Sequence, residues 1–155
     1  MSVRIIKDYG IEDIKASIRR MLDDAAQDVE VRGLAVSIAW DNPLQNINSW
    51  VKANVHYVPD PHDVELFTSP SRMIREYNEG KPLAGDCDDM ALLSVALLRA
   101  VGIRSNVVLL DTKGEGLDHA VAQAWSDKLN AWVYVDPSSR LPFGWEEQAR
   151  SKVVV

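Results

Sequence analysis

The sequence of 155 residues contains a single cysteine, Cys87, and this scarcity excludes several classes of protein. One cysteine cannot form an internal disulfide, which fits a reducing compartment. It also cannot supply the several thiolates of a multi-cysteine zinc or iron–sulfur site. Cys87 itself is therefore either a small buried hydrophobic side chain or a nucleophile.

Long apolar runs and clusters of positive charge are also missing. The longest apolar run, from Met90 to Leu98, is broken by Ser94 and is far shorter than the ~20 residues of a membrane span. Residues 1–10 lack the apolar stretch of a secretory signal, so we expect a cytoplasmic protein. The 17 basic and 23 acidic residues give a net charge of −6 without a basic cluster, which argues against a nucleic-acid partner.

The first two-thirds of the chain has the spacing of helices. Apolar residues recur every three or four positions from Ile11 to about Asp28, which predicts an amphipathic helix. Asn42-Pro43 and Ser69-Pro70 are typical starts of two further helices. The segment from about Asp86 to Val101 is apolar on nearly all sides, which predicts a buried central helix.

After this segment the period of the apolar residues changes from 3.6 to 2. Residues 106–110, 118–125 and 131–136 are predicted to be strands, the second with alanines 120, 122 and 124 on one face. Residues 153–155 are either an edge strand or a loose tail. Helices followed by antiparallel strands predict the α+β class, with a central helix packed on a small antiparallel sheet.

The position of Cys87 favours its interpretation as a nucleophile. It lies in the first turn of the buried helix, where backbone N–H groups and the helix dipole are expected to stabilise a thiolate and an oxyanion. Asp86 is the expected N-cap of that helix. Asp88 and Asp89 oppose thiolate formation, so a nearby imidazolium is needed.

His119 and Asp136 can supply and orient that imidazole. If Ser126 faces Ala131, the two residues become diagonal neighbours on one face, within hydrogen-bonding reach of each other. The two side chains meet on one face only if the turn between the strands has an even number of residues. This register predicts a hydrogen bond of about 2.6–3.2 Å between the imidazole and the carboxylate. Taken singly, His119 could be an ordinary histidine and Asp136 the start of a turn.

Three motifs in this order resemble the transglutaminase-like superfamily. They are Gly85-Asp86-Cys87-Asp88-Asp89 before an apolar helix, Asp118-His119-Ala120, and Tyr134-Val135-Asp136-Pro137. The resemblance covers roughly residues 45–140 and implies a papain-like core, with Cys87 as nucleophile, His119 as general base and then acid, and Asp136 orienting the imidazole. We therefore expect a single domain over residues 1–155, with a helical extension at 1–42 and a catalytic core at 43–140.

The implied function is a cysteine-dependent amide hydrolase or acyl transferase that acts on a protein or peptide through a thioester, with no cofactor or metal. The apparent lack of accessory domains favours hydrolysis over cross-linking. The alternative is an inactive binding or structural module, such as a phage-associated protein. The second oxyanion donor is Trp50, Asn54 or Tyr57, and the sequence does not choose among them.

Other polar residues have simpler interpretations. His56 and His62 flank a proline-bounded loop and are expected to be ordinary solvated residues. A metal site is the weaker interpretation of the acidic cluster, because consecutive helical positions point in different directions. Such a site would combine His119 with Asp86, Asp88 and Asp89. A turn with two glycines at Lys113–Gly116 is expected to be mobile and to border the cleft.

Overall fold

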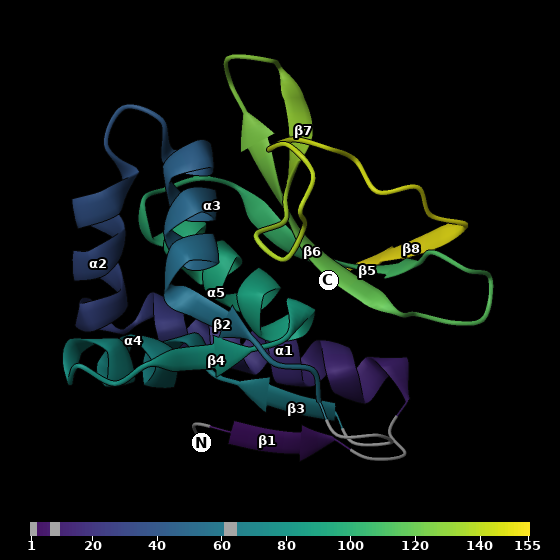
Figure 1. Ribbon diagram of the computed structural model, residues 1–155, viewed down its shortest axis with the longest axis horizontal. Coiled ribbons are helices and arrows are strands. Elements are labelled where there is room, and N and C mark those ends of the chain that lie inside the picture. Colours follow the sequence, from purple (N-terminus) through teal and green to yellow (C-terminus); the bar gives the residue numbers. More distant parts are fainter. Residues whose placement is uncertain (1–2, 7–9, 61–64) are drawn as a thin grey trace.

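The computed structural model describes residues 3–6, 10–60 and 65–155, with side chains for 10–60 and 67–155. Helices gather on one side and a four-stranded antiparallel sheet on the other, with α5 between them (Figure 1). The helices are α1 (Ile11–Ala26), α2 (Val29–Ala39), α3 (Pro43–Asn54), α4 (Pro70–Asn78) and α5 (Cys87–Ala100). The strands are β1 (Val3–Ile6), β2 (Val55–Tyr57), β3 (Glu65–Thr68), β4 (Leu83–Gly85), β5 (Ser105–Asp111), β6 (His119–Ser126), β7 (Ala131–Val135) and β8 (Ser151–Val154). The predicted α+β class is confirmed.

Helix α5 is the centre of the fold, as its apolar sequence predicts. Every residue from Met90 to Leu98 is buried. Helices α1, α2, α3 and α4 all contact α5, and β6 contacts it from the side of the sheet. Each large apolar side chain that is fully buried contributes about 1.5–3 kcal/mol. This helix therefore supplies much of the free energy that holds the helical layer on the sheet.

The four-stranded sheet has the order β7-β6-β5-β8, and each neighbouring pair is antiparallel. The alternation predicted for β6 is present. Ala120, Ala122 and Ala124 belong to the main core with α5, whereas Val121 packs with Tyr134 in a small cluster of its own. Because alanines are small, the sheet can approach α5 closely at β6.

The hairpin between β6 and β7 has the predicted register. Ser126 pairs with Ala131, which leaves a turn of four residues, and the pairing continues to Ala122 and Val135. The last turn residue, Asn130, has a φ of 52°, a left-handed conformation that asparagine tolerates better than most residues. A four-residue turn preserves the parity of the two strands, so side chains 119 and 136 can meet.

Two small sheets of two strands each were not predicted. Strands β1 and β3 pair antiparallel, and β2 and β4 pair parallel, with Tyr57 opposite Gly85. The parallel pairing continues with a hydrogen bond from the Val58 N–H to the Gly85 carbonyl, at 2.9 Å. It brings Tyr57 next to the residues that precede Cys87. Strands of three or four residues are too short for alternation to identify them in a sequence.

Helices α1 and α2 and the C-terminal strand β8 pack against the core. Helix α2 begins after Asp28, whose carboxylate accepts a hydrogen bond from the Glu30 N–H at 2.9 Å, and α1 and α2 contribute Ile18 and Val31 to the same core as α5. The C-terminal residues form β8 on the free edge of β5, which decides between the edge strand and the loose tail. Of the helices in the described residues, none combines the length and the apolarity that a membrane crossing requires.

Candidate active site

Cys87 is the first residue of α5, and two aspartates hold this end of the helix. The Asp86 carboxylate accepts hydrogen bonds from the N–H groups of Asp88, at 3.1 Å, and Asp89, at 3.4 Å. Asp89 reciprocates, because its Oδ2 accepts the Asp86 N–H at 3.1 Å. The predicted N-cap role of Asp86 is confirmed, and this capping box fixes the backbone on both sides of Cys87.

Asp89 also connects the helix to the rest of the fold. Its side chain is buried, and Oδ1 accepts the N–H of Thr68 in β3 at 2.7 Å. Gly85 is packed so closely against it that a Cβ atom at position 85 would lie 2.7 Å from the Asp89 Cβ. Asp89 is therefore a structural residue, and position 85 has no space for a side chain.

Replacing Gly85 by alanine should lower the free energy of unfolding by about 1–3 kcal/mol, because the added methyl group displaces Asp89 from the capping box. Gly33→Ala is a matched control in α2, where nothing lies within 4 Å of the added Cβ. Alanine is the better helix former, so this variant should gain about 1 kcal/mol. Urea denaturation followed by circular dichroism measures both changes. Equal stability of the two variants would contradict this role of Gly85.

The hydrogen bond predicted between His119 and Asp136 is present. His119 Nε2 lies 2.9 Å from Asp136 Oδ2. His119 is the first residue of β6 and Asp136 directly follows β7, so the hairpin register is what brings them together. With Nε2 occupied by the carboxylate, Nδ1 is the ring nitrogen left for another partner.

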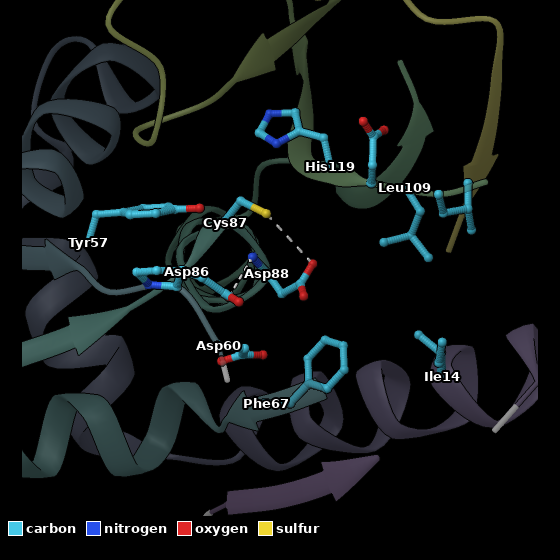
Figure 2. Close-up of a pocket in the computed structure, with 12 residues that line it drawn as sticks. Ile14, Tyr57, Asp60, Phe67, Asp86, Cys87, Asp88, Leu109 and His119 are labelled. Carbon is cyan, nitrogen blue, oxygen red and sulfur yellow. Dashed lines mark hydrogen bonds between the residues drawn. The ribbon is translucent and has the colours of Figure 1, made fainter. Parts of the chain in front are cut away.

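Cys87 and His119 line one cavity of about 220 Å³. In Figure 2 the His119 ring lies above Cys87 in the view, and the Tyr57 ring extends toward Cys87. Phe67 and Leu109 form apolar parts of the wall. The cavity is a space in which a carbonyl group could meet both the thiol and the imidazole.

The thiol of Cys87 is less acidic than its position in the helix predicts. Burial raises the pKa of this thiol, the negative charge of Asp88 raises it further, and a hydrogen bond from the Ala120 backbone lowers it only in part. The Asp88 carboxylate is close, with Oδ1 4.0 Å from Sγ. The expected stabilisation of a thiolate is therefore not met in the protein without substrate, because burial and the charge of Asp88 raise the pKa of the thiol. The thiol must transfer its proton to a base in order to react.

His119 is suited to receive a proton. The hydrogen bond that His119 donates to the Asp136 carboxylate raises the pKa of this histidine, whereas burial lowers it. The charges of Asp136, Glu147 and Asp118 raise it further. A group that binds a proton more readily than ordinary histidine, beside a cavity that contains a thiol, matches the base that Cys87 needs.

The three candidates for a second oxyanion donor differ in their surroundings. Trp50 packs edge to face on Tyr77 of α4, with ring centroids 5.0 Å apart. The Asn54 side-chain amide donates to the Trp50 carbonyl in its own helix, at 2.8 Å. Tyr57 alone of the three lines the cavity with Cys87. The strand pairing of β2 with β4 positions Tyr57 there, and the sequence did not predict this pairing.

An acidic cluster adjoins the thiol. The carboxylates of Asp60, Asp86 and Asp88 offer oxygen atoms that all lie within 4.8 Å of one another. Asp60 and Asp86 share a hydrogen bond, and burial together with the charges of Asp89 and Asp60 raises the pKa of Asp86 to about 7. The carboxylates of Asp86 and Asp88 therefore do converge, contrary to the expectation from helical spacing, because Asp86 is the N-cap and lies outside the regular helix. Asp60 joins them in place of Asp89 and His119.

The predictions about the other histidines and about the turn at Lys113–Gly116 have different outcomes. His56 is exposed, as expected, and His62 lies outside the described residues. The turn at Lys113–Gly116 was expected to border the cleft, but the cavity wall in this part of the chain consists of Leu117, Asp118 and His119. The turn itself is held by the Asp111 carboxylate, which accepts hydrogen bonds from the three N–H groups of residues 113–115.

We expect the melting temperature to fall as the pH rises from about 5 to 8. Burial raises the pKa of Asp86 to about 7 and that of Asp89 to about 6, so over this range the folded state keeps protons that the unfolded chain has lost. The pKa of His119 is also raised, and its contribution is present below the ordinary histidine value and lost above the folded one. Thermal unfolding at several pH values measures the trend. Asp86→Asn retains a capping side chain and should flatten it, and a melting temperature that rises toward pH 8 would refute the explanation.

Two solved structures share the fold of this chain. A candidate cysteine protease from Cytophaga hutchinsonii has a TM-score of 0.57 and 22% identity, over 90% of this chain and 50% of that one. A candidate protease from Parabacteroides distasonis has a TM-score of 0.58 and 17% identity, over 82% of this chain and 26% of that one. This chain thus spans half or less of the length of either protein. At these identities the similarity establishes the fold alone.

A match to a protein-family model shows the family to which the chain belongs. The model of the transglutaminase-like superfamily matches residues 35–137, which is more than half of the chain and includes Cys87, His119 and Asp136. No curated protein sequence matches the chain at a significant level. The resemblance found in the sequence motifs is confirmed, and the chain belongs to the transglutaminase-like superfamily.

Proposed function

We propose that the protein is a cysteine-dependent amide hydrolase or acyl transferase that acts on a protein or peptide, with Cys87, His119 and Asp136 as its catalytic triad. The observation that carries this proposal is the 2.9 Å contact between His119 Nε2 and Asp136 Oδ2, on a histidine that shares a cavity with Cys87. The three residues come from α5, β6 and the segment after β7. An oriented imidazole beside a thiol is the arrangement that nucleophilic catalysis requires.

In the first step the Cys87 proton moves to His119 Nδ1 as the sulfur attacks the carbonyl carbon of the substrate amide. Because burial raises the pKa of the thiol, this transfer accompanies the attack rather than preceding it. Asp136 accepts the hydrogen bond from Nε2 and stabilises the imidazolium. His119 then donates the proton to the departing amine, the C–N bond breaks, and a thioester remains on Cys87.

The oxyanion of the tetrahedral intermediate needs two donors. Asp86 accepts from the Asp88 and Asp89 amides, so the N–H of Cys87 is the first-turn donor that this carboxylate does not occupy. The Tyr57 hydroxyl is the second donor in this proposal, because Tyr57 lines the cavity whereas Trp50 and Asn54 have partners elsewhere. Burial and the neighbouring acidic groups raise the pKa of Tyr57, so its hydroxyl keeps the proton that it donates.

The second step returns the enzyme to its starting state. Water or a primary amine attacks the thioester carbonyl carbon, and His119 accepts the proton that the attacking group loses. The C–S bond breaks, the sulfur recovers a proton from His119, and the product is a carboxylic acid or a new amide. The nature of the attacking group decides whether the enzyme is a hydrolase or a transferase.

Mass spectrometry of a peptide mixture incubated with the protein tests this proposal directly. Wild type should cleave, deamidate or cross-link peptides, and each reaction leaves a different mass change. Cys87→Ala should leave the mixture unchanged, whereas Ser94→Ala, a control inside the same helix, should behave as wild type. Ser94 is buried and donates only to the Met90 carbonyl of its own helix, at 2.8 Å. A wild-type protein that changes no peptide would refute the proposal.

The partial burial of Cys87 favours one rival, a binding module that keeps the fold without catalysis. Burial and Asp88 raise the pKa of the thiol, and an inactive relative would tolerate this without consequence. A thiol reagent separates the two functions. Modification of the native protein that His119→Gln slows supports the enzyme, because only a working base assists the thiol. Modification that requires denaturant supports the binding module.

A further inference from the structure

The Asp136 carboxylate has a second partner besides His119. Its Oδ2 faces the imidazole at 2.9 Å, and its Oδ1 accepts two hydrogen bonds from Ser138. The Ser138 N–H lies 3.1 Å from Oδ1, and the Ser138 hydroxyl lies 2.5 Å from the same atom. Both carboxylate oxygens of Asp136 therefore have hydrogen-bond partners, and together these bonds fix the orientation of the carboxylate plane.

The backbone of the turn that contains Ser138 is fixed independently of this hydroxyl. The Ser139 N–H donates to the Asp136 carbonyl at 3.2 Å, and Lys52 of α3 donates to the Ser139 carbonyl at 2.9 Å. Pro137 further restricts the backbone between the two residues. The turn does not need the hydroxyl of Ser138 to keep its shape, so the short contact of that hydroxyl with Oδ1 acts on the carboxylate alone.

We propose that Ser138 is a positioning residue, which fixes the rotation of the Asp136 carboxylate and thereby the direction of the His119 ring. Without the hydroxyl, one weaker N–H bond remains on Oδ1 and the carboxylate can rotate about χ2. Rotation moves Oδ2 away from Nε2 and leaves the imidazole free to turn from the thiol. The effect on turnover rests on the proposed function, whereas the effect on the histidine does not.

The charged groups around His119 allow two roles of Ser138 to be separated. Asp136, Asp118 and Glu147 all raise the pKa of His119, and the Cys87 thiol faces the cavity that His119 lines. If Ser138 positions Asp136, its loss weakens the hydrogen bond to the imidazole and lowers the pKa of His119 toward the ordinary value. If the hydroxyl only solvates the carboxylate, its loss makes that carboxylate a stronger acceptor and raises the pKa of His119. The two roles therefore predict changes of opposite sign in the pKa of His119 when the Ser138 hydroxyl is removed.

An NMR titration of the histidine rings in the full chain tests the proposal. The sequence has three histidines, and His119→Gln identifies the signal of His119. We expect Ser138→Ala to lower the pKa of His119 by about 0.5–1 unit. Ser138→Thr retains a hydroxyl and should restore the wild-type value. Ser139→Ala is the matched control, because its hydroxyl accepts from the Leu141 N–H, at 3.0 Å, and does not contact Asp136. An unchanged or raised pKa in Ser138→Ala would overturn the proposal.

Two further measurements complete the test. In an active protein, Ser138→Ala should reduce kcat about tenfold with little change in KM, and should move the pH profile in the same direction as the NMR value. If wild type has no activity, the titration still decides the role of Ser138. If Ser138→Ala does not fold, the wild-type hydroxyl proton remains as the readout. Slow exchange of that proton with water supports the proposal, and rapid exchange refutes it.

Discussion

Cys87→Ala should abolish amide-bond activity, with a loss of at least about 10⁴-fold in kcat, while the fold stays intact. Alanine cannot form the thioester, so only uncatalysed turnover by the remaining groups is left. The change is mild for the structure, because alanine favours helices and the capping box of Asp86 and Asp89 does not involve the sulfur. We expect the free energy of unfolding to change by less than about 1 kcal/mol.

Initial rates on any peptide that the mass spectrometry identifies measure this effect, with urea denaturation as the check on folding. Ser94→Ala is the control from the same helix and should retain the wild-type rate. A Cys87→Ala rate within tenfold of wild type would remove Cys87 from the mechanism. A large loss of stability in the same variant would instead mean that its inactivity reports unfolding.

Asp136→Asn should reduce the rate by about 10⁴-fold, the loss that an incorrect histidine tautomer causes in other triads. The reason lies in the partners of the side chain. Ser138 presents an N–H donor to Oδ1, and this donor requires an oxygen atom there. The asparagine therefore turns its NH₂ group toward His119 Nε2, which must become an acceptor. The ring proton then lies on Nδ1, and His119 cannot accept the proton of Cys87.

The same variant should leave the fold unchanged, because asparagine keeps the volume and the Ser138 contact of aspartate. Asp127→Asn is the matched control on the same hairpin. Its carboxylate accepts from the Trp125 indole at 3.0 Å and lies outside the triad, so the rate should not change. Kinetics and melting curves of the two variants measure these effects. Full activity in Asp136→Asn would show that His119 does not depend on this residue for its tautomer.

The parts of the site that were predicted depend on contacts between neighbours in the sequence. The apolar helix with Cys87 in its first turn follows from residues 86–101 alone, and its N-cap is the adjacent Asp86. The His119–Asp136 hydrogen bond follows from the period of two strands and the parity of one short turn. In each case a local period fixes the face on which a side chain lies.

The parts that were not predicted depend on contacts between distant segments. The pairing of β2 with β4 joins residues 55–57 to residues 83–85, and it decides that Tyr57 rather than Trp50 or Asn54 reaches the cavity. The Asp89 carboxylate accepts the backbone N–H of Thr68, which is another contact between distant segments. No local period encodes such pairings, because they form only when the whole chain packs.

The acidity of the Cys87 thiol also depends on both local sequence and contacts between distant segments. The sequence by itself determined that Cys87 begins a helix, that His119 and Asp136 share a face, and that the chain has an α+β fold. Only the tertiary structure decided how deeply the sulfur is buried and that Asp60 joins Asp86 and Asp88 beside it. A helix terminus is a local property, whereas desolvation and the sum of nearby charges depend on every segment that packs around the atom.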